Sequence, residues 1–114
     1  MHTVIELPPY LAAAKAAGMT AQEMEDAVFM VASDPQGGDI IQGTGGCRKY
    51  RLAGRGKGKS GGYRIITVFG GRDMPVFMLT VFGKGQKDNL SRAERNELAI
   101  VTRNLIETYH RRRR

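Results

Sequence analysis

Residues 63–82 read YRIITVFGGRDMPVFMLTVF, two apolar runs on either side of a polar turn. The runs are rich in aromatic and β-branched side chains, which predicts strands at residues 63–69 and 76–82. The glycine pair followed by Arg72 and Asp73 favours a hairpin connection between them. The second run is apolar almost throughout, which predicts a central strand that is covered on both faces.

Further strands are expected upstream of this hairpin. Residues 47–53 alternate in character and predict a strand with Lys49 and Arg51 on one face and apolar side chains on the other. Residues 54–62 are rich in glycine and lysine and are expected to form a loop. Residues 2–7 predict a short strand, which ends at two prolines because proline cannot donate to a strand ladder.

Helices are predicted from apolar spacing and from capping signals. Residues 10–17 are rich in alanine and end at a glycine, and residues 20–23 form a capping box that opens a second helix. Asp34 ends that helix, because the residue before a proline disfavours helical geometry. A second capping box at residues 91–94 begins a long C-terminal helix. Its apolar stripe consists of Leu98, Val101, Thr102, Leu105, Ile106 and Tyr109.

These elements predict an α+β fold in a single domain, since 114 residues are too few for two independent cores. The expected order is an N-terminal strand, a helical hairpin, a three-stranded antiparallel meander and a C-terminal helix. We expect the helices to cover one face of a largely antiparallel sheet. Residues 111–114 are four arginines, for which we expect a disordered basic tail.

Positive charge is concentrated in one stretch of the chain. The formal net charge is +7, yet residues 1–46 carry six acidic side chains and one basic side chain. Residues 47–64 carry seven basic side chains and no acidic one. Such a stretch repels itself, so we expect a polyanionic partner, with nucleic acid as the first candidate and a merely solvated basic face as the alternative.

Other chemistries have little support in the sequence. Cys47 is the single cysteine, which excludes an internal disulfide and a multi-cysteine zinc site. Residues 53–60, AGRGKGKS, fit the loose phosphate-loop pattern, but they lead into a strand instead of the helix that such a loop requires. No apolar run is long enough to cross a bilayer and no signal peptide is evident. We therefore expect a cytoplasmic protein with no metal, no cofactor and no membrane contact.

The basic side chains divide into two candidate groups. Lys49, Arg51 and Arg64 lie on neighbouring predicted strands, and Lys84 and Lys87 follow the last one, so we expect them to converge on one face or edge of the sheet and to form a site. The candidate RNA-binding residues are Arg48, Arg55, Lys57, Lys59 and Lys87. For any one of these residues alone, a solvated surface position is the alternative.

An ordered set of short motifs resembles the RelE/HigB group of bacterial toxins, within the RelE/ParE superfamily, and is most similar to its HigB-like branch. The matching stretches are VIEL at residues 4–7, GTGG at 43–46, Arg48 with Lys49, GKSGG at 58–62, RII at 64–66, FML at 77–79, Lys84, and LSRAE at 90–94. The resemblance implies a RelE-like fold and cleavage of mRNA in the ribosomal A site. It also implies a cognate antitoxin, expected to be of the helix-turn-helix DNA-binding type.

The resemblance also implies roles for individual residues. The family's paired basic residues match Lys49 and Arg51, and the Tyr-Arg pair that begins its next strand matches residues 63–64. A basic residue is expected where this chain has Gly85, so Lys84 or Lys87 would substitute for it. The C-terminal catalytic tyrosine of some members has no clear counterpart.

Such a site would cleave RNA through the substrate's own 2′-hydroxyl group. The reaction needs a base, cations that stabilise charge on phosphorus, and a proton donor for the leaving oxygen. Lys49 is the candidate base, Arg51 and Arg64 would stabilise charge, and Lys84 or Lys87 would donate the proton. The alternative is a non-catalytic nucleic-acid or antitoxin-binding module, a decayed toxin that acts in operon autoregulation.

Two modes of antitoxin action are compatible with this reading. An acidic segment could mask the basic strand face directly, or the antitoxin could dock elsewhere and block entry into the ribosome by its bulk. The larger apolar surface expected on the helices favours the second mode.

Overall fold

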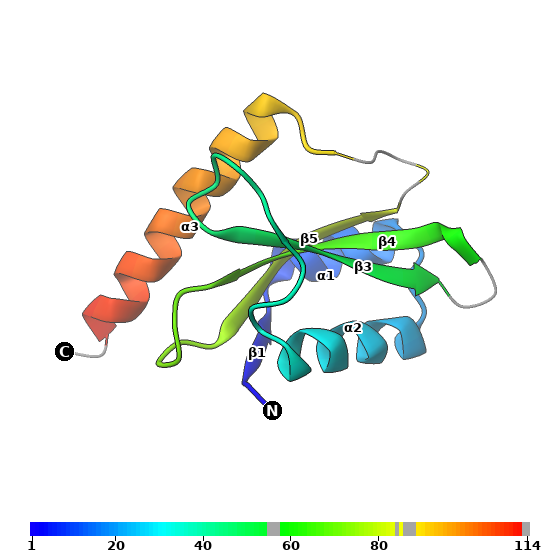
Figure 1. Ribbon diagram of the computed structural model, residues 1–114, viewed down its shortest axis with the longest axis horizontal. Helices are drawn as coiled ribbons and strands as arrows, with labels where there is room; N and C mark the ends of the chain where they lie inside the picture. Colours follow the sequence, from blue (N-terminus) through cyan, green and yellow to red (C-terminus); the bar gives the residue numbers. More distant parts are fainter. Residues whose placement is uncertain (55–57, 84, 86–88, 113–114) are drawn as a thin grey trace.

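The computed structural model describes residues 1–54, 58–83, 85 and 89–112, with the exception of the side chains of residues 58–61 and 112. The described residues form an α+β domain in which helices pack on a single sheet (Figure 1). The elements in chain order are β1 (Val4–Glu6), α1 (Pro8–Ala16), α2 (Ala21–Ser33), β2 (Asp39–Ile40), β3 (Cys47–Gly54), β4 (Gly58–Phe69), β5 (Val76–Gly83) and α3 (Arg92–Arg112).

The sheet has five strands in the order β1-β5-β4-β3-β2. The predicted antiparallel meander is confirmed as β3, β4 and β5, and β5 is an interior strand that is largely buried on both faces. Two pairings differ from the expectation. β1 runs parallel to β5, and β2 adds a short antiparallel strand outside β3, so the sheet is mixed. In addition, β4 begins at Gly58, within the segment for which a loop was expected.

The expectation that all helices cover one face is wrong, because α1 and α2 pack on one face of the sheet and α3 packs on the other. Ile65 of β4 belongs to the core beneath α1 and α2, whereas its neighbour Ile66 belongs to the core beneath α3. Consecutive strand residues point to opposite faces. A strand with apolar side chains at both positions therefore needs cover on both sides.

A bulge in β5 adjusts which of its side chains reach each core. Thr67 pairs with Met78 and Ile66 pairs with Thr80, so Leu79 is an extra residue in β5. Leu79 and Phe82, three positions apart, consequently both lie in the core beneath α3. The bulge thus places Phe82 on the same face as its β4 partner, Arg64.

A buried carboxylate ties α2 to β4. The capping box predicted at Thr20 is present, with the Thr20 amide donating to Glu23 Oε1 at 2.8 Å and the Glu23 amide donating to Thr20 Oγ1 at 3.1 Å. The same Oε1 atom accepts a hydrogen bond from the Tyr63 hydroxyl at 3.0 Å. Glu23 and Tyr63 are each 1% exposed. One side chain therefore caps the helix and anchors the strand that carries Arg64.

Cys47 has a packing role at the contact between β3 and α3. Its Sγ atom lies 3.1 Å from Thr102 Oγ1 of α3, and both side chains are buried. Burial raises the pKa of the Cys47 thiol, against the hydrogen bonds with Thr102 and Thr44, which lower it. The thiol is therefore poorly suited to nucleophilic chemistry.

Two buried tyrosines provide a matched test of these contacts. The Tyr10 hydroxyl has no hydrogen-bond partner among the described residues, whereas the Tyr63 hydroxyl donates to Glu23. We expect Tyr10→Phe to leave the free energy of unfolding within about 1 kcal/mol of wild type or to increase it. Tyr63→Phe should lower it by about 1–3 kcal/mol, because a buried carboxylate loses a donor. Urea unfolding followed by circular dichroism measures the free energy of unfolding of each variant. Equal losses of stability in the two variants would contradict the hydrogen bonding described for these tyrosines.

Alkaline pH gives a second readout of the Tyr10 environment. Burial, aided by the nearby Glu6 carboxylate, raises the pKa of Tyr10 from 10.0 to about 12. The unfolded chain therefore loses the Tyr10 proton at a lower pH than the folded protein does. The contribution of this group to the free energy of unfolding is complete below pH 10.0 and is lost as the pH rises towards 12. Tyr10→Phe should show a shallower loss of stability over this interval than wild type. Identical pH profiles would contradict the burial of a neutral phenol.

Candidate nucleic-acid interface

Three cations share the face of the sheet on which α3 packs. Arg51 of β3 lies directly opposite Arg64 of β4, and Lys49 lies opposite Ile66. Directly opposed residues of an antiparallel pair project from the same face, and Ile66 belongs to the core beneath α3. Lys49, Arg51 and Arg64 are called the cation cluster below.

α3 packs on the start of β3 and does not follow this strand to its end. Cys47, at the start of β3, contacts Thr102 in the middle of α3. From there the β3–β4 hairpin continues past the helix, as Figure 1 shows. Arg51 is exposed and Lys49 is half-buried. The sheet therefore holds two of its cations at a solvent-accessible surface.

Arg64 is buried, with 6% of its surface exposed. Its Nη1 atom donates to the Tyr63 carbonyl at a long 3.4 Å. No carboxylate of a described residue forms an ion pair with it. A buried guanidinium without a counter-charge is costly, and Arg51 directly opposite adds a like charge. A phosphate oxygen at this position would offset both the cost of burying Arg64 and its repulsion from Arg51.

Lys49 has a neutral partner. Its Nζ atom donates to Asn89 Oδ1 at 3.3 Å, across the segment that leads into α3. Asp39 of β2 is opposite Lys49 in register, but no ion pair between them lies within the 4.0 Å limit. The amide thus orients the ammonium group while leaving its charge available to an anion.

The structure does not bring all of the predicted site residues together. Arg48 alternates with Lys49 and points to the opposite face, where its Nη1 atom donates to the carbonyls of Gln36 at 2.7 Å and Gly37 at 3.4 Å. Its guanidinium holds the loop that follows α2. Arg55, Lys57, Lys84 and Lys87 lie outside the described residues. Lys59 lies in β4, and its side chain is likewise outside the described part.

Two residues that support the cluster were not among the predicted site residues. Asn89 orients Lys49, and Glu23 anchors Tyr63, the neighbour of Arg64. The capping-box pattern indicated the contact of Glu23 with its own helix. Nothing in the sequence indicated its bond to a strand 40 positions away.

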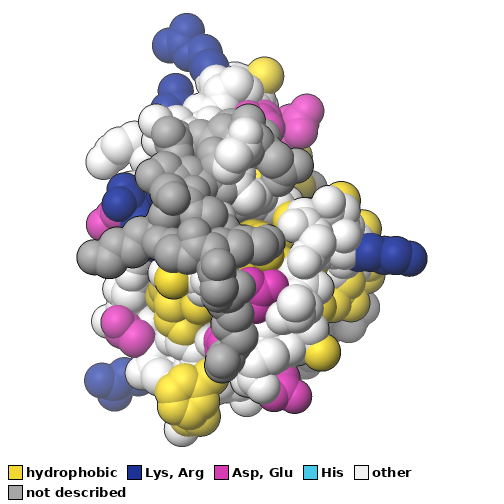
Figure 2. Space-filling model, turned by 90° about the vertical axis from the view of Figure 1, so that its right-hand side faces the viewer, with side chains coloured by type: hydrophobic (Ala, Val, Ile, Leu, Met, Phe, Trp, Pro, Cys, Tyr) yellow, Lys and Arg dark blue, Asp and Glu magenta, His cyan; other side chains and the backbone are white. Residues whose placement is uncertain are grey.

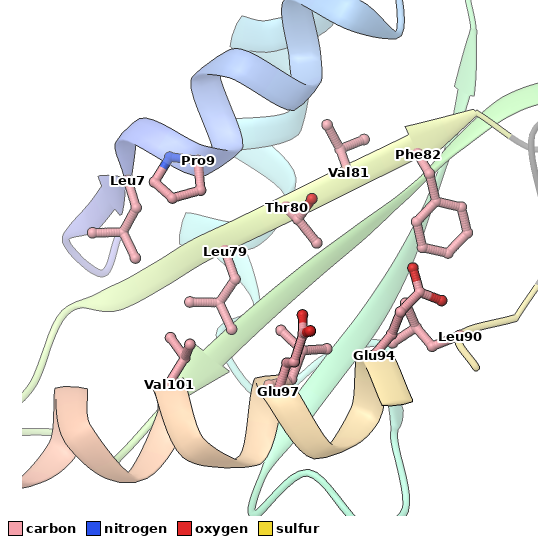
Figure 3. A pocket seen from close by; sticks show the side chains of 11 residues that line it. Leu7, Pro9, Leu79, Thr80, Val81, Phe82, Leu90, Glu94, Glu97 and Val101 are labelled. Carbon is pink, nitrogen blue, oxygen red and sulfur yellow. The ribbon is translucent and has the colours of Figure 1, made fainter. Parts of the chain in front are cut away.

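An apolar groove of about 310 Å³ adjoins the cluster. Its floor is formed by residues 79–82 of β5, and its walls come from α3 and from the start of α1 (Figure 3). Phe82 links the groove to the cluster, because it is the register partner of Arg64. The carboxylates of Glu94 and Glu97 project from α3 towards β5 (Figure 3). Their negative charge makes the groove unsuitable for phosphate and leaves it open to an uncharged ring.

The described part of the chain supports neither a metal site nor a membrane-spanning helix. Its His, Cys, Asp and Glu residues form no group of three that could hold a metal ion. Among the same residues, no helix is both long and apolar enough to cross a membrane.

The fold and the cluster define a class of protein: a small α+β domain whose sheet carries buried and exposed cations on one face. A family model described as the RelE toxin of the RelE/RelB toxin-antitoxin system matches residues 10–112. The chain therefore belongs to the RelE toxin family and is a toxin of a toxin–antitoxin system.

Two arginine substitutions separate a binding role from a structural one. We expect Arg64→Met to leave the thermal midpoint unchanged or raise it, because it removes a buried charge without a counter-charge. The same change should weaken binding to a single-stranded RNA such as poly(U) about tenfold at low salt. Fluorescence anisotropy measures the affinity.

The matched control is Arg48→Met. It should lower the free energy of unfolding by about 1 kcal/mol, since two carbonyls lose their donor, and change RNA affinity less than about threefold. If Arg48→Met weakened RNA binding as much as Arg64→Met, the cluster would not be the binding site.

Proposed function

We propose that this chain inhibits translation as a ribosome-dependent endoribonuclease that cleaves mRNA in the ribosomal A site, in the cytoplasm. The observation that carries the proposal is the positive charge of the cation cluster, which forms no ion pair with a carboxylate of a described residue. Arg64 is buried opposite Arg51 with no described carboxylate beside it, an arrangement that favours a bound phosphate. Membership in the RelE family supports endoribonuclease activity in general.

The proposed reaction uses the 2′-hydroxyl of the substrate as its nucleophile. This oxygen attacks the adjacent phosphorus and forms a new O–P bond, while the bond from phosphorus to the 5′-oxygen of the next nucleotide breaks. The products are a 2′,3′-cyclic phosphate and a 5′-hydroxyl end. Lys49 in its neutral form takes the hydroxyl proton, and Lys84 or Lys87 returns a proton to the leaving oxygen.

Arg51 and Arg64 act on the charge that accumulates at phosphorus. Their opposed positions allow two guanidinium groups to donate to the non-bridging oxygens of one phosphate. The burial of Arg64 strengthens this interaction, since it lies away from bulk water. A cation that is costly in the free protein is thereby stabilised in the transition state.

The ribosome and the adjoining groove complete the proposal. An mRNA held by the ribosome arrives oriented, which reduces the demand on the acid–base groups of the toxin. The groove beside Phe82 would accept a base from that strand, because its apolar floor suits a ring and its carboxylates can accept from amino groups.

A non-catalytic role in nucleic-acid and antitoxin binding is the second candidate. One observation favours it: Tyr109 is half-buried and packs edge-on against Phe77 of the core beneath α3, with ring centroids 6.5 Å apart. This contact supports a packing role for the C-terminal tyrosine. Gly85 also stands where the resemblance leads one to expect a cation.

A reconstituted translation system tests the two candidates. We expect wild-type protein to cut a defined mRNA only when ribosomes are present, with the cut at the A-site codon and a cyclic phosphate on the upstream fragment. Arg64→Met should slow the cleavage about 100-fold to 1,000-fold, which is typical for the loss of one charge-stabilising donor. Primer extension on timed samples measures the rate.

The control in that experiment is Arg48→Met. Once its folding is verified, this variant should cleave the mRNA at a rate within a few-fold of the wild-type rate. Ribosome binding without cleavage of any mRNA would favour the non-catalytic candidate. Cleavage of free RNA at the same rate would contradict ribosome dependence.

A further inference from the structure

The outer surface of the helical hairpin carries an apolar groove that the proposed activity does not use. The groove has a volume of about 610 Å³ and lies between α1, α2 and the start of the chain. Phe29 is 65% exposed and Leu11 is 43% exposed. The other apolar lining residues are Met1, Ala21, Met24, Val28 and Ala32. Exposed apolar patches of this kind are typical of protein interaction sites.

Phe29 and Leu11 do not belong to the core, whereas Met24 and Val28 pack partly against it and Ala32 is buried. The inward faces of the two helices pack on the sheet through Tyr10 and Ala14 of α1 and through Ala27 and Val31 of α2. The Glu23–Tyr63 bond fixes α2 to β4. The groove is therefore a preformed surface on well-anchored helices, so binding there costs little rearrangement.

The rim of the groove is acidic. Glu6 and Glu25 are among the described lining residues, which include no lysine or arginine. Residues 1–46 have a net charge of −5, whereas residues 47–114 have a net charge of +12. Figure 2 shows hydrophobic side chains exposed at the lower edge of the molecule, where α2 lies, with acidic side chains close by. The charge at the rim of the groove is thus negative, whereas the cation cluster, on the opposite face of the sheet, is positive.

We propose that this groove binds an amphipathic helix of the antitoxin, with apolar side chains seated against Phe29 and Leu11 and with lysine or arginine side chains opposite Glu6 and Glu25. Helices that bind in grooves use such a row of apolar anchors, and opposite charges at the rim set the orientation. The antitoxin then neutralises the toxin by its bulk, and the cation cluster stays uncovered. This reading of neutralisation rests on the proposed function, whereas the binding site itself does not.

Titration calorimetry with the purified cognate antitoxin tests the proposal. Phe29→Asp should weaken binding about 30-fold, because it places a charge at the apolar anchor. Glu25→Lys should weaken it several-fold at low salt and less at high salt, because a rim charge is screened. The matched control, Ile100→Asp, changes an apolar side chain of α3 that is 55% exposed and lies outside the groove, and it should leave the affinity within about threefold.

The triple variant Lys49→Gln/Arg51→Gln/Arg64→Gln distinguishes the two faces. Its affinity for the antitoxin should stay within about threefold of wild type, and the wild-type complex should still bind poly(U). Unchanged affinity for Phe29→Asp, or a loss above tenfold for the triple variant alone, would overturn the proposal. Binding and cleavage are separate readouts. A chain that fails to cleave mRNA yet loses antitoxin affinity through Phe29→Asp would refute the proposed function and support this site.

Discussion

The pairing of β3 with β4 sets Arg51 directly opposite Arg64, and the rest of the structure depends on that constraint. Two like charges in register are unfavourable in an isolated hairpin. Here two cores, one on each face of the sheet, stabilise the pairing. The Glu23–Tyr63 hydrogen bond then anchors β4 one residue before Arg64. The fold thereby holds two like charges in register, an arrangement that we propose a bound anion would stabilise.

The same framework separates charge and function in space. The helical hairpin comes from the acidic part of the chain and carries an apolar groove on its outer surface. The strands that follow carry the cation cluster on the opposite face. Under the two proposals above, the molecule would bind a polyanion on one side and a protein on the other. Neither binding event needs to exclude the other by direct contact.

Much of the fold was predictable because local signals agreed with the tertiary structure. The apolar runs became β4 and β5, and both capping boxes formed, at Thr20 and at Ser91. The two-residue period of β3 correctly placed Lys49 and Arg51 together. The same period placed Arg48 on the other face, where it bonds the loop after α2.

Long-range features were not predictable from the sequence. The parallel pairing of β1 with β5 depends on where the helical hairpin returns the chain, which no local pattern encodes. The two residues of β2 are too few to produce a periodic signal. The burial of Arg64 and its proximity to the Glu23–Tyr63 bond arise from packing between segments far apart in the chain. The placement of α3 is different. The apolar residues on both faces of β4 do indicate that both faces are covered, but we expected helices on one face only.

The central claim is that Arg51 and Arg64 repel each other in the free protein and are stabilised together by a phosphate. A double-mutant cycle with Arg51→Gln and Arg64→Gln measures this directly, through the free energy of unfolding at low salt with and without inorganic pyrophosphate. The account predicts an unfavourable coupling of about 0.5–1 kcal/mol without the anion, which vanishes or becomes favourable when pyrophosphate is added. A coupling of zero in both conditions would contradict it.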